Sequence, residues 1–297
     1  PRYTSYPTIP FWTRRPNQDA MLAEIENEVL KGRYFSLYFH LPFCEKLCHF
    51  CACFKVIDPR REHSQSYLEA ILREYELITM SKRLKVSQLH WGGGTPTFYN
   101  PADLTKLFDG IASKIHIANK AELSVEANPT ITSRDHLRTL RSLGFNRISF
   151  GVQDFDPKIQ DVINRHQTFE QTIEVTSVAR DLGFESVNVD LIYGLPLQTE
   201  QSIQSTIQAL TKLRPDRIAF YSYANVPWKH PFQRRFKDED LPTGLKKIQL
   251  YLLGREILLD AGYAAIGMDH FALPTDELFQ ARTAGKLHRN FMGYTTQ

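Results

Sequence analysis

The cysteines are the residues whose spacing most clearly predicts chemistry in this 297-residue chain. All of them lie between residues 44 and 53, as Cys44, Cys48, Cys51 and Cys53. The first three have the spacing C-x3-C-x2-C, which lets one short loop direct three thiolates to a single point. An iron–sulfur cluster is ordinarily closed by four cysteines, so a [4Fe–4S] cube held by these three keeps one iron open. An open iron can bind a small molecule, as the open position of a catalytic zinc ion does.

A structural zinc ion is the main alternative use of these cysteines. Three cysteines together with His40 or His49 form a common type of zinc site. Such a site needs no further motif elsewhere in the chain, whereas several are present here. A disulfide is disfavoured, because the chain opens with Pro1-Arg-Tyr-Thr-Ser-Tyr6 and shows no apolar secretory segment. We leave Cys53 outside the cluster, as a structural thiol or a redox-sensitive bystander.

A glycine-rich segment, Gly92-Gly-Gly-Thr-Pro96, directly follows a candidate strand. Adjacent glycines permit positive φ and let backbone amides approach a ligand closely. Such a turn often serves only to redirect the chain, but here it comes next after the cysteine loop in strand order. We therefore expect its backbone to lie beside that loop and to contact a bound ligand.

Polar or small residues stand near the C-terminal ends of the later candidate strands: Glu126, Gln153, Asp154, Asp190, Tyr223 and Ala224. A single acid at a strand end is usually a solvated loop residue, but a series of such residues at one rim indicates a site. Asp190 lies inside an apolar run, so it needs hydrogen-bond partners in the protein or on a ligand. Arg165 is placed either to hold a carboxylate bidentately or to cap a helix in solvent.

Tyr38 and His40 alternate with apolar residues on the first candidate strand, so their side chains share one face. On the interior face near the cysteine loop they would touch a cofactor or a substrate, and we consider both as candidate catalytic residues. The alternative for a single strand histidine is core packing. Phe50, between two cysteines, either packs on an adenine ring or shields the cluster from water.

Strands and helices that position these residues alternate from about residue 34. Short β-rich runs predict strands at Ser36–His40, Gln88–Trp91, Glu122–Glu126, Arg147–Val152, Ser186–Ile192 and Arg217–Tyr223. Amphipathic stretches predict helices at Ser66–Ser81, Leu104–Ser113, Arg134–Leu143, Thr168–Leu182 and Gln201–Leu213. This alternation implies a parallel sheet with right-handed crossovers. We therefore predict an α/β fold, a partial (β/α)6 barrel with its active site at the C-terminal ends of the strands.

The ends of the chain fall outside the alternation. Residues 1–33 combine an extended segment rich in Pro and Tyr with a helix near Asp19–Lys31, and residues 34–297 form the barrel. Beyond a further helix up to Asp260 the tail shows no stop signal, so we expect a truncated chain without a C-terminal helical domain. Strands such as Val187–Ile192 are largely apolar, which suits burial on both faces.

Composition and charge exclude several classes of protein. The chain is 42% hydrophobic and 23% charged, and no apolar run approaches the ~20 residues that span a bilayer. A net charge of +3 is too small to indicate a nucleic-acid partner. An acidic ligand would have to meet local cations, for which Arg2, Lys229, His230, Arg234, Arg235 and Lys237 are the candidates. We expect a monomer in the cytoplasm, where reduced thiols and an oxygen-sensitive cluster persist.

Over essentially all of its length the sequence resembles one known family. The motifs that carry the resemblance are Pro1-Arg-Tyr-Thr-Ser-Tyr-Pro7, Tyr38-Phe-His-Leu-Pro-Phe-Cys44, His90-Trp-Gly-Gly-Gly-Thr-Pro-Thr97, Gly151-Val-Gln-Asp154, Asn188-Val-Asp-Leu-Ile-Tyr-Gly-Leu-Pro196, Gly267-Met-Asp-His-Phe271 and the closing His288–Gln297. The cysteine triplet alone resembles the radical S-adenosylmethionine superfamily. The terminal motifs resemble, within it, the oxygen-independent coproporphyrinogen III oxidases.

The resemblance implies a role for each matching position. Cys44, Cys48 and Cys51 would ligate a [4Fe–4S] cluster, and Tyr38, Gly93 and Glu126 would bind an S-adenosylmethionine on its open iron. A second S-adenosylmethionine would be bound by Phe50, Gly94, Thr95, Gln153, Arg165, Asp190 and Ala224. The implied reaction converts two propionates of coproporphyrinogen III to vinyl groups, with an electron donor and an acceptor that the sequence does not identify.

A haem chaperone of the same superfamily is the nearest alternative function. Those relatives share the cysteine loop and the glycine-rich turn, but they lack the Cys-x-Cys ending and the Tyr-Thr-Ser-Tyr-Pro opening, and this chain has both. The chain departs from the oxidase family by ending at Gln297 and by an irregular stretch at Asn225–Pro231.

Overall fold

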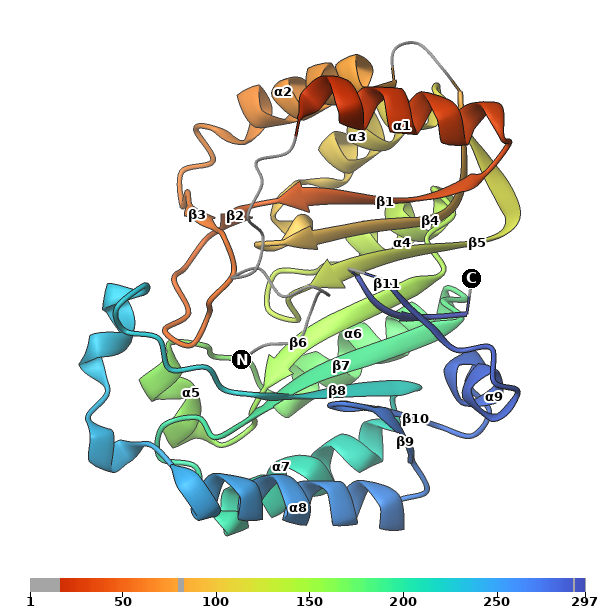
Figure 1. The fold of residues 1–297 in the computed structure, drawn as a ribbon. Helices are drawn as coiled ribbons and strands as arrows, with labels where there is room; N and C mark the ends of the chain where they lie inside the picture. The colour runs from red at the N-terminus through yellow and green to blue at the C-terminus, as the bar shows by residue number, and fades with distance from the viewer. Residues whose placement is uncertain (1–16, 80–82, 291, 297) are drawn as a thin grey trace.

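The computed structural model describes residues 17–79, 83–290 and 292–296. Its central sheet has the strand order β1-β4-β5-β6-β7-β8-β10-β9, and the neighbours from β1 to β8 are parallel. The parallel strands are β1 (Tyr34–Leu41), β4 (Leu84–Gly93), β5 (Ile115–Ala127), β6 (Arg147–Gln153), β7 (Ser186–Tyr193) and β8 (Arg217–Ser222). β1 and β9 stand at the two ends of this order, so the curved sheet is an open, partial barrel, as the sequence predicts (Figure 1).

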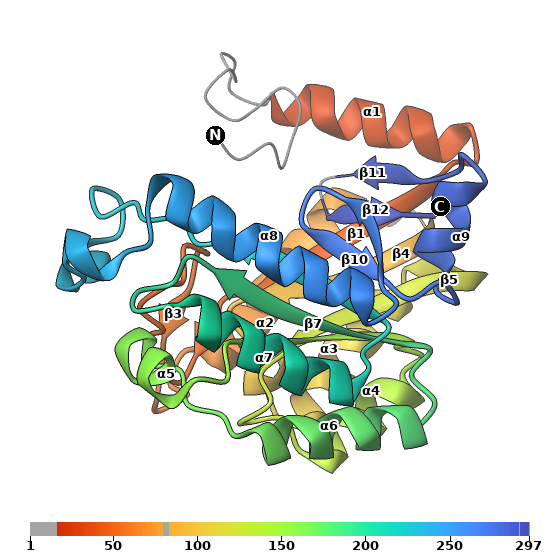
Figure 2. The same cartoon turned by 90° about the horizontal axis from the view of Figure 1, so that it is seen from below.

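Helices cover the outer face of the sheet (Figures 1 and 2). They are α2 (Ser64–Thr79), α3 (Pro101–Ala112), α4 (Arg134–Ser142), α6 (Phe169–Asp181), α7 (Glu200–Leu213) and α8 (Gly244–Asp260). Helices α4, α6 and α7 begin at the hydroxyl caps Ser133, Thr168 and Thr199, each of which accepts a backbone N–H from its first turn. Gly144 (φ 96°) and Gly183 (φ 86°) follow α4 and α6, in the left-handed conformation that commonly ends a helix.

The apolar core lies between the sheet and its helices. Trp91 of β4, fully buried, packs on Phe145 with ring centroids 4.6 Å apart. Val187 and Val189 of β7 are also buried in this layer, but Asp190 on the opposite face lines a cavity inside the barrel. No residue of β7 is exposed, as its composition predicts, but its inner face lines a polar cavity instead of a second packed core.

The predicted strands and helices of the barrel are all present, with ends that differ by a few residues. Strands β4 and β5 begin earlier than predicted, at Leu84 and Ile115. Short elements were missed: β2 (Phe43–Cys44), β3 (Val56–Ile57), α5 (Pro157–Ile163), β9 (Ala264–Gly267), β10 (His270–Ala272), α9 (Glu277–Thr283), β11 (His288–Asn290) and β12 (Gly293–Thr295). Such short segments contain too little periodicity to identify from sequence.

The predictions for the two ends of the chain can be compared with the structure in part. Helix α1 (Gln18–Leu30) confirms the predicted N-terminal helix, whereas the extended part, with Arg2, lies outside the described residues. The hairpin β11–β12 folds back onto the barrel, where Asn290 donates to Gln88 Oε1 of β4 at 2.9 Å and Gln88 donates to Thr295. Among the residues that the structure describes, no helix has the length and apolar character of a membrane span.

Candidate active site

The cysteine loop leaves the end of β1 and is anchored to α5. The backbone N–H of His49 donates to the Ile163 carbonyl at 2.8 Å, and the Asn164 side chain donates to the Leu47 carbonyl at 2.8 Å. Asn164 is the left-handed C-cap of α5. A helix that the sequence did not predict therefore holds the loop in place at the C-terminal end of the barrel strands, which we call the mouth.

Cys44 and Cys48 are partly buried in this loop. The Cys44 Sγ lies 3.5 Å from Thr95 Oγ1, and Arg165 Nη1 lies 4.0 Å from the Cys48 Sγ. Burial raises the pKa of both thiols, although the charge of Arg165 acts in the opposite direction. A desolvated thiolate needs a cationic partner, which a bound metal supplies when it deprotonates the thiol.

Cys51 and Cys53 form a hydrogen-bonded pair at the end of the loop. The hydrogen bond from Cys53 lowers the pKa of the Cys51 thiol to about 6 and raises the pKa of Cys53. Lys55 Nζ donates to the carbonyls of both residues, at 2.9 Å and 3.3 Å. Cys53 stands next to Cys51 at an exposed position, whereas Cys51 is partly buried.

The cysteines do not converge as ligands of a single ion would. No group of three His, Cys, Asp or Glu side chains in the described ranges is close enough to hold one metal ion. A cube of iron and sulfide spreads its cysteine ligands over separate iron atoms. The donor set, three cysteine sulfurs on one anchored loop, accordingly fits a cluster.

The glycine-rich turn packs directly on the start of the cysteine loop, as expected. Gly94 donates its N–H to the Leu41 carbonyl at 2.9 Å, and a Cβ at Gly94 would lie 2.3 Å from the Pro42 carbonyl oxygen. Gly93 has φ 117°, and a Cβ there would lie 2.6 Å from the His40 ring. Only glycine allows this approach, which brings Thr95 beside Cys44.

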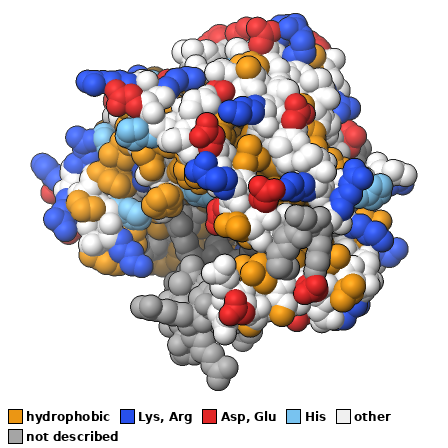
Figure 3. Space-filling view, turned by 90° about the horizontal axis from the view of Figure 1, so that it is seen from above, with side chains coloured by type: hydrophobic (Ala, Val, Ile, Leu, Met, Phe, Trp, Pro, Cys, Tyr) orange, Lys and Arg blue, Asp and Glu red, His pale blue; other side chains and the backbone are white. Residues whose placement is uncertain are grey.

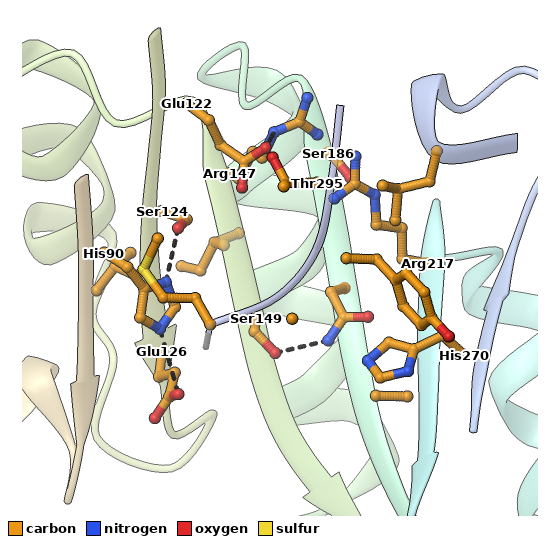
Figure 4. Close-up of a pocket in the computed structure, with 18 of the residues that line it drawn as sticks. His90, Glu122, Ser124, Glu126, Arg147, Ser149, Ser186, Arg217, His270 and Thr295 are labelled. Atoms are coloured by element: carbon orange, nitrogen blue, oxygen red, sulfur yellow. Dashed lines mark hydrogen bonds and ion pairs between the residues drawn. The ribbon is translucent and has the colours of Figure 1, made fainter. Parts of the chain in front are cut away.

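Glu126 at the end of β5 is held by its neighbours on β4. Its Oε2 accepts the Gly93 N–H at 3.1 Å, and its Oε1 lies 3.3 Å from His90 Nε2. Burial alone would raise the pKa of Glu126, but the hydrogen bonds from His90 and Gly93 outweigh it and leave the pKa below its ordinary value. Figure 4 shows His90 between Ser124 and Glu126. The carboxylate is therefore ionised and faces the mouth.

Tyr38 and His40 lie on the same face of β1, as the alternation predicts. Tyr38 Oη and His40 Nδ1 are 3.0 Å apart, and His40 Nε2 lies 3.0 Å from the Phe54 carbonyl oxygen. Because a carbonyl only accepts, Nε2 carries the proton and Nδ1 accepts from Tyr38. The Tyr38 ring also stacks on His90 at 5.7 Å. In this arrangement His40 orients Tyr38 and the end of the cysteine loop.

Asp190 belongs to a polar cluster inside the barrel. Its two oxygens accept hydrogen bonds from Ser149, at 3.1 Å, and from Asn188, at 2.8 Å. Burial and the charge of Glu126 raise the pKa of Asp190 to about 7. These residues line an open cavity of about 170 Å³ that also includes His90 and Tyr221 (Figure 4). The two acids of the cavity therefore differ, because their surroundings lower the pKa of Glu126 and raise the pKa of Asp190.

Gln153 and Arg165 are positioned by a buried network that sequence reasoning missed. Gln153 has φ 73°, a conformation that costs a non-glycine residue about 1–3 kcal/mol and that clusters at functional sites. The next residue, Asp154, is fully buried and accepts from Gln198 at 2.6 Å and from Thr206 at 2.8 Å. Arg165 donates to Gln167 and to the Gly151 carbonyl. Asp154 therefore braces the rim from behind instead of facing the cavity.

Phe50 and Ala224 are brought together by Gln233, another residue that sequence reasoning missed. Its buried amide donates to the Phe50 carbonyl at 3.4 Å and to the Ala224 carbonyl at 3.2 Å. On either side of Ala224, Tyr223 Oη and Asn225 Oδ1 are buried atoms without a hydrogen-bond partner among the described residues. Neither residue lines the cavity around Asp190, and Tyr223 packs in an apolar cluster with Phe236.

The basic segment after β8 lies against the cysteine loop. Arg235 contacts the His49 ring, and Arg234 donates to the Pro227 carbonyl at 3.3 Å. Trp228 beside them is 71% exposed. Figure 3 shows Lys, Arg and His side chains gathered with apolar ones at its left margin, the side on which β2 and β3 lie in Figure 1. The candidate cations for an acidic substrate are thus near the mouth, except Arg2, which lies outside the described residues.

Known proteins match this chain over its whole length. The model of the radical SAM superfamily matches residues 38–210. The oxygen-independent coproporphyrinogen III oxidase of Salmonella typhimurium is 44% identical over 298 residues, and the enzyme of that name from Escherichia coli is 42% identical over 300. Each alignment includes 100% of this chain and 65% of the relative, so the chain spans about two thirds of their length.

Solved structures agree with the sequence matches. The structure described as "Coproporphyrinogen III oxidase (HemN) from Escherichia coli is a Radical SAM enzyme" has a TM-score of 0.93 and 42% identity, covering 99% of this chain and 68% of its own. A structure of anSMEcpe with bound AdoMet has a TM-score of 0.52 at 14% identity, covering 76% of this chain and 60% of its own. The second likeness concerns the fold alone.

Proposed function

Because this chain belongs to the radical S-adenosylmethionine superfamily and, within it, to the oxygen-independent coproporphyrinogen III oxidases, we propose that the protein is an oxidoreductase of haem biosynthesis. Its substrate is coproporphyrinogen III, two propionates of which become vinyl groups to give protoporphyrinogen IX. The observation that carries the proposal is the meeting of Cys44, Cys48 and Cys51 with the glycine-rich turn and Glu126 at one end of the barrel.

The cofactors follow from the same residues. Cys44, Cys48 and Cys51 hold a [4Fe–4S] cluster, and Tyr38 with the Gly93 backbone and Glu126 binds the S-adenosylmethionine at its open iron. A second S-adenosylmethionine is held by the residues that the resemblance to the family implies: Phe50, Gly94, Thr95, Gln153, Arg165, Asp190 and Ala224. In its support, Asp190 lines the cavity inside the barrel and Thr95 lies beside Cys44.

When bound, the cluster and S-adenosylmethionine supply a 5′-deoxyadenosyl radical that removes a hydrogen atom from a propionate β-carbon. The protein orients the reactants and excludes water. Glu126, ionised and aimed at the mouth, accepts hydrogen bonds from an amino group. Asp190, whose pKa is raised by burial, lines the cavity and is placed to bind a ribose hydroxyl. Tyr38, oriented by His40, covers the same ligand from β1.

The remaining partners are inferred from charge and chemistry. The four propionates bring about four negative charges at neutral pH. Cations near the mouth, such as Arg234 and Arg235, are placed to meet them. An electron donor must reduce the cluster and an acceptor must take the electron released with each CO2. We place the protein in the cytoplasm as a monomer that uses neither nucleic acid nor a membrane, since its thiols are free and its net charge is only +3.

Anaerobic turnover of the full-length protein tests the proposal. The reconstituted protein, a chemical reductant, coproporphyrinogen III and S-adenosylmethionine should give 5′-deoxyadenosine, CO2 and protoporphyrinogen IX, the last measured as its oxidised porphyrin. A brown, cluster-containing protein that binds haem tightly but forms no vinyl product would indicate a haem chaperone. A colourless protein that retains zinc would indicate a structural zinc site.

A further inference from the structure

The cysteine loop and the segment that follows β8 meet at the mouth, although β1 stands at one end of the sheet and β8 far from it in the strand order. Gln233 of that segment donates to the Phe50 carbonyl at 3.4 Å. Lys55 Nζ, just after the cysteine loop, lies 4.6 Å from the centre of the Phe232 ring. The two segments therefore lie side by side and together border the candidate cofactor site (Figure 1).

Two exposed aromatic side chains belong to these segments, Phe54 and Trp228. Phe54 is 72% exposed and Trp228 is 71% exposed, and no other Phe, Tyr or Trp among the described residues is as exposed. Single exposed apolar side chains are common, but several in one region indicate an interaction site. Figure 3 shows apolar side chains gathered with basic ones on this side of the molecule. The mouth therefore presents aromatic surface that a ligand could cover.

Phe54 lies next to the candidate cofactor site. Its ring centroid is 5.8 Å from that of His40, and its carbonyl accepts a hydrogen bond from His40 Nε2 at 3.0 Å. The other nitrogen of His40 lies 3.0 Å from the hydroxyl of Tyr38. A ligand that packs on Phe54 would thus be separated by one imidazole ring from a residue that we assign to S-adenosylmethionine.

Trp228 stands on a turn whose backbone is fixed on both sides. The Val226 carbonyl accepts the N–H of Lys229 at 2.9 Å, and the Pro227 carbonyl accepts from Arg234 at 3.3 Å. These bonds hold the turn in one conformation before any ligand arrives. Because a side chain on a preorganised segment loses less conformational freedom on binding, the exposed indole is suited to be a contact residue.

Cations accompany the exposed rings. Arg234 donates to a backbone carbonyl, and Arg235 contacts the His49 ring, so these partners leave both positive charges in place. Lys237, in contrast, forms an ion pair with Glu239 at 3.4 Å. Aromatic faces next to unneutralised arginines suit a ligand that is both apolar and anionic, because the rings pack on its apolar part and the guanidinium groups bind its carboxylates.

We propose that Phe54 and Trp228 bind the tetrapyrrole ring system of coproporphyrinogen III, an inference that rests on the proposed function. The faces of its pyrrole rings are apolar and can pack on aromatic side chains, while its propionates lie at the edge. Two propionates become vinyl groups and two remain in the product. The two that remain need cations away from the reacting carbon, and Arg234 and Arg235 are placed for them.

Steady-state kinetics of the full-length, cluster-loaded protein with a chemical reductant test the proposal. Trp228→Ser removes an exposed ring, so the fold should be unaffected. The KM for coproporphyrinogen III should rise about 5–20-fold, as expected for the loss of one aromatic contact and its buried area, whereas the KM for S-adenosylmethionine should stay within about twofold. Phe54→Ser should behave in the same way, with cluster iron measured alongside. Trp228→Phe keeps an aromatic face and should raise the KM less than about threefold.

Leu77→Ser is the matched control, because Leu77 of α2 is equally exposed, at 71%, on a helix outside the sheet. Its KM values should equal those of the unmodified protein. An unchanged KM for coproporphyrinogen III in Trp228→Ser and Phe54→Ser would overturn the proposal, and so would an equal rise in the KM for S-adenosylmethionine.

The remaining outcomes separate this inference from its alternatives. An effect of Trp228→Ser that appears only with a protein electron donor would assign the exposed rings to that donor and overturn the proposal. If Phe54→Ser loses its cluster, the Trp228→Ser result decides. Absence of vinyl product with the unmodified, cluster-loaded protein would overturn the proposed function itself.

Discussion

Charged side chains have different partners at the two ends of the barrel. At the N-terminal end of the strands, Arg147 pairs with Glu122 at 3.1 Å and with Glu277, and Arg217 pairs with Asp276 at 2.9 Å. We call this N-terminal end the floor of the barrel. Its charged side chains form ion pairs with one another, and the arginine side chains are only 11% and 13% exposed.

At the mouth, the charged and ionisable groups are held by hydrogen bonds to uncharged partners instead of by ion pairs with one another. Glu126 is bound by a backbone N–H and an imidazole, and Asp190 by Ser149 and Asn188. Arg165 is bound by Gln167 and a carbonyl. We infer from this difference that the ion pairs of the floor stabilise the fold, whereas the charged side chains of the mouth are available to bind ligands, as is general for parallel barrels.

Removal of a cluster cysteine should have the largest effect, and it should be confined to the mouth. Cys48→Ala leaves two thiolates of the C-x3-C-x2-C loop, which are too few to hold a [4Fe–4S] cube with one open iron. We expect loss of nearly all cluster iron and of all turnover, measured by iron content and visible absorbance after anaerobic reconstitution. Cys53→Ala is the matched comparison and should retain the cluster. A full cluster in Cys48→Ala would contradict the assignment.

A substitution at the floor should instead lower the free energy of unfolding of the protein. Arg147→Met leaves Glu122 without its cation in a buried position, which should cost about 3–5 kcal/mol in the free energy of unfolding. Affinity for S-adenosylmethionine should stay within about twofold if the protein is folded, since the mouth is unchanged. Denaturant unfolding and calorimetric titration measure the two. Arg138→Met, which breaks a pair with an exposed Asp135, should cost less than about 1 kcal/mol.

Asp190→Asn should show whether this mouth residue contributes to S-adenosylmethionine binding or to the stability of the fold. Loss of a charged acceptor should weaken S-adenosylmethionine binding about 10–100-fold, by the usual strength of hydrogen bonds to charged groups. Because the folded state raises the pKa of Asp190 to about 7, its contribution to stability is full below pH 3.8 and is lost as the pH rises toward 7.

The asparagine variant should therefore be as stable as the unmodified protein at pH 8, or more so, and its stability should vary less between pH 4 and pH 7. Thermal unfolding across this range provides the measurement. A large loss of stability with unchanged cofactor affinity would instead assign Asp190 to the support of the barrel.

The smallest effect is expected for cations that meet the substrate propionates. Arg2→Lys retains the charge but removes the bidentate geometry, so it should raise the KM for coproporphyrinogen III about 3–10-fold while cleavage of S-adenosylmethionine continues. Steady-state kinetics with the full-length protein measure it. Unchanged kinetics in this variant and in a protein without residues 1–7 would exclude the opening segment from the substrate site.

Much of the fold was predictable because the barrel strands and helices are long and periodic. Sequence reasoning also identified Glu126 and Asp190 as residues of one rim, because parallel strands end at the same edge. It missed α5, which anchors the cysteine loop through Asn164, and the antiparallel pair β9–β10, since segments of a few residues carry little periodicity. It also missed Gln233, a buried amide in an irregular segment.

By itself the sequence determined the family of the protein and predicted the donor set of the site, since Cys44, Cys48 and Cys51 are local in the chain and the glycine-rich turn has a recognisable composition. Only the tertiary structure decided which polar residues share a surface. His90 and Glu126 are 36 positions apart, and Asp154 and Thr206 are 52 apart, yet both pairs are in hydrogen-bond contact. The physical reason is that sheet register and helix packing set these distances, and neither is encoded in the local pattern of residues.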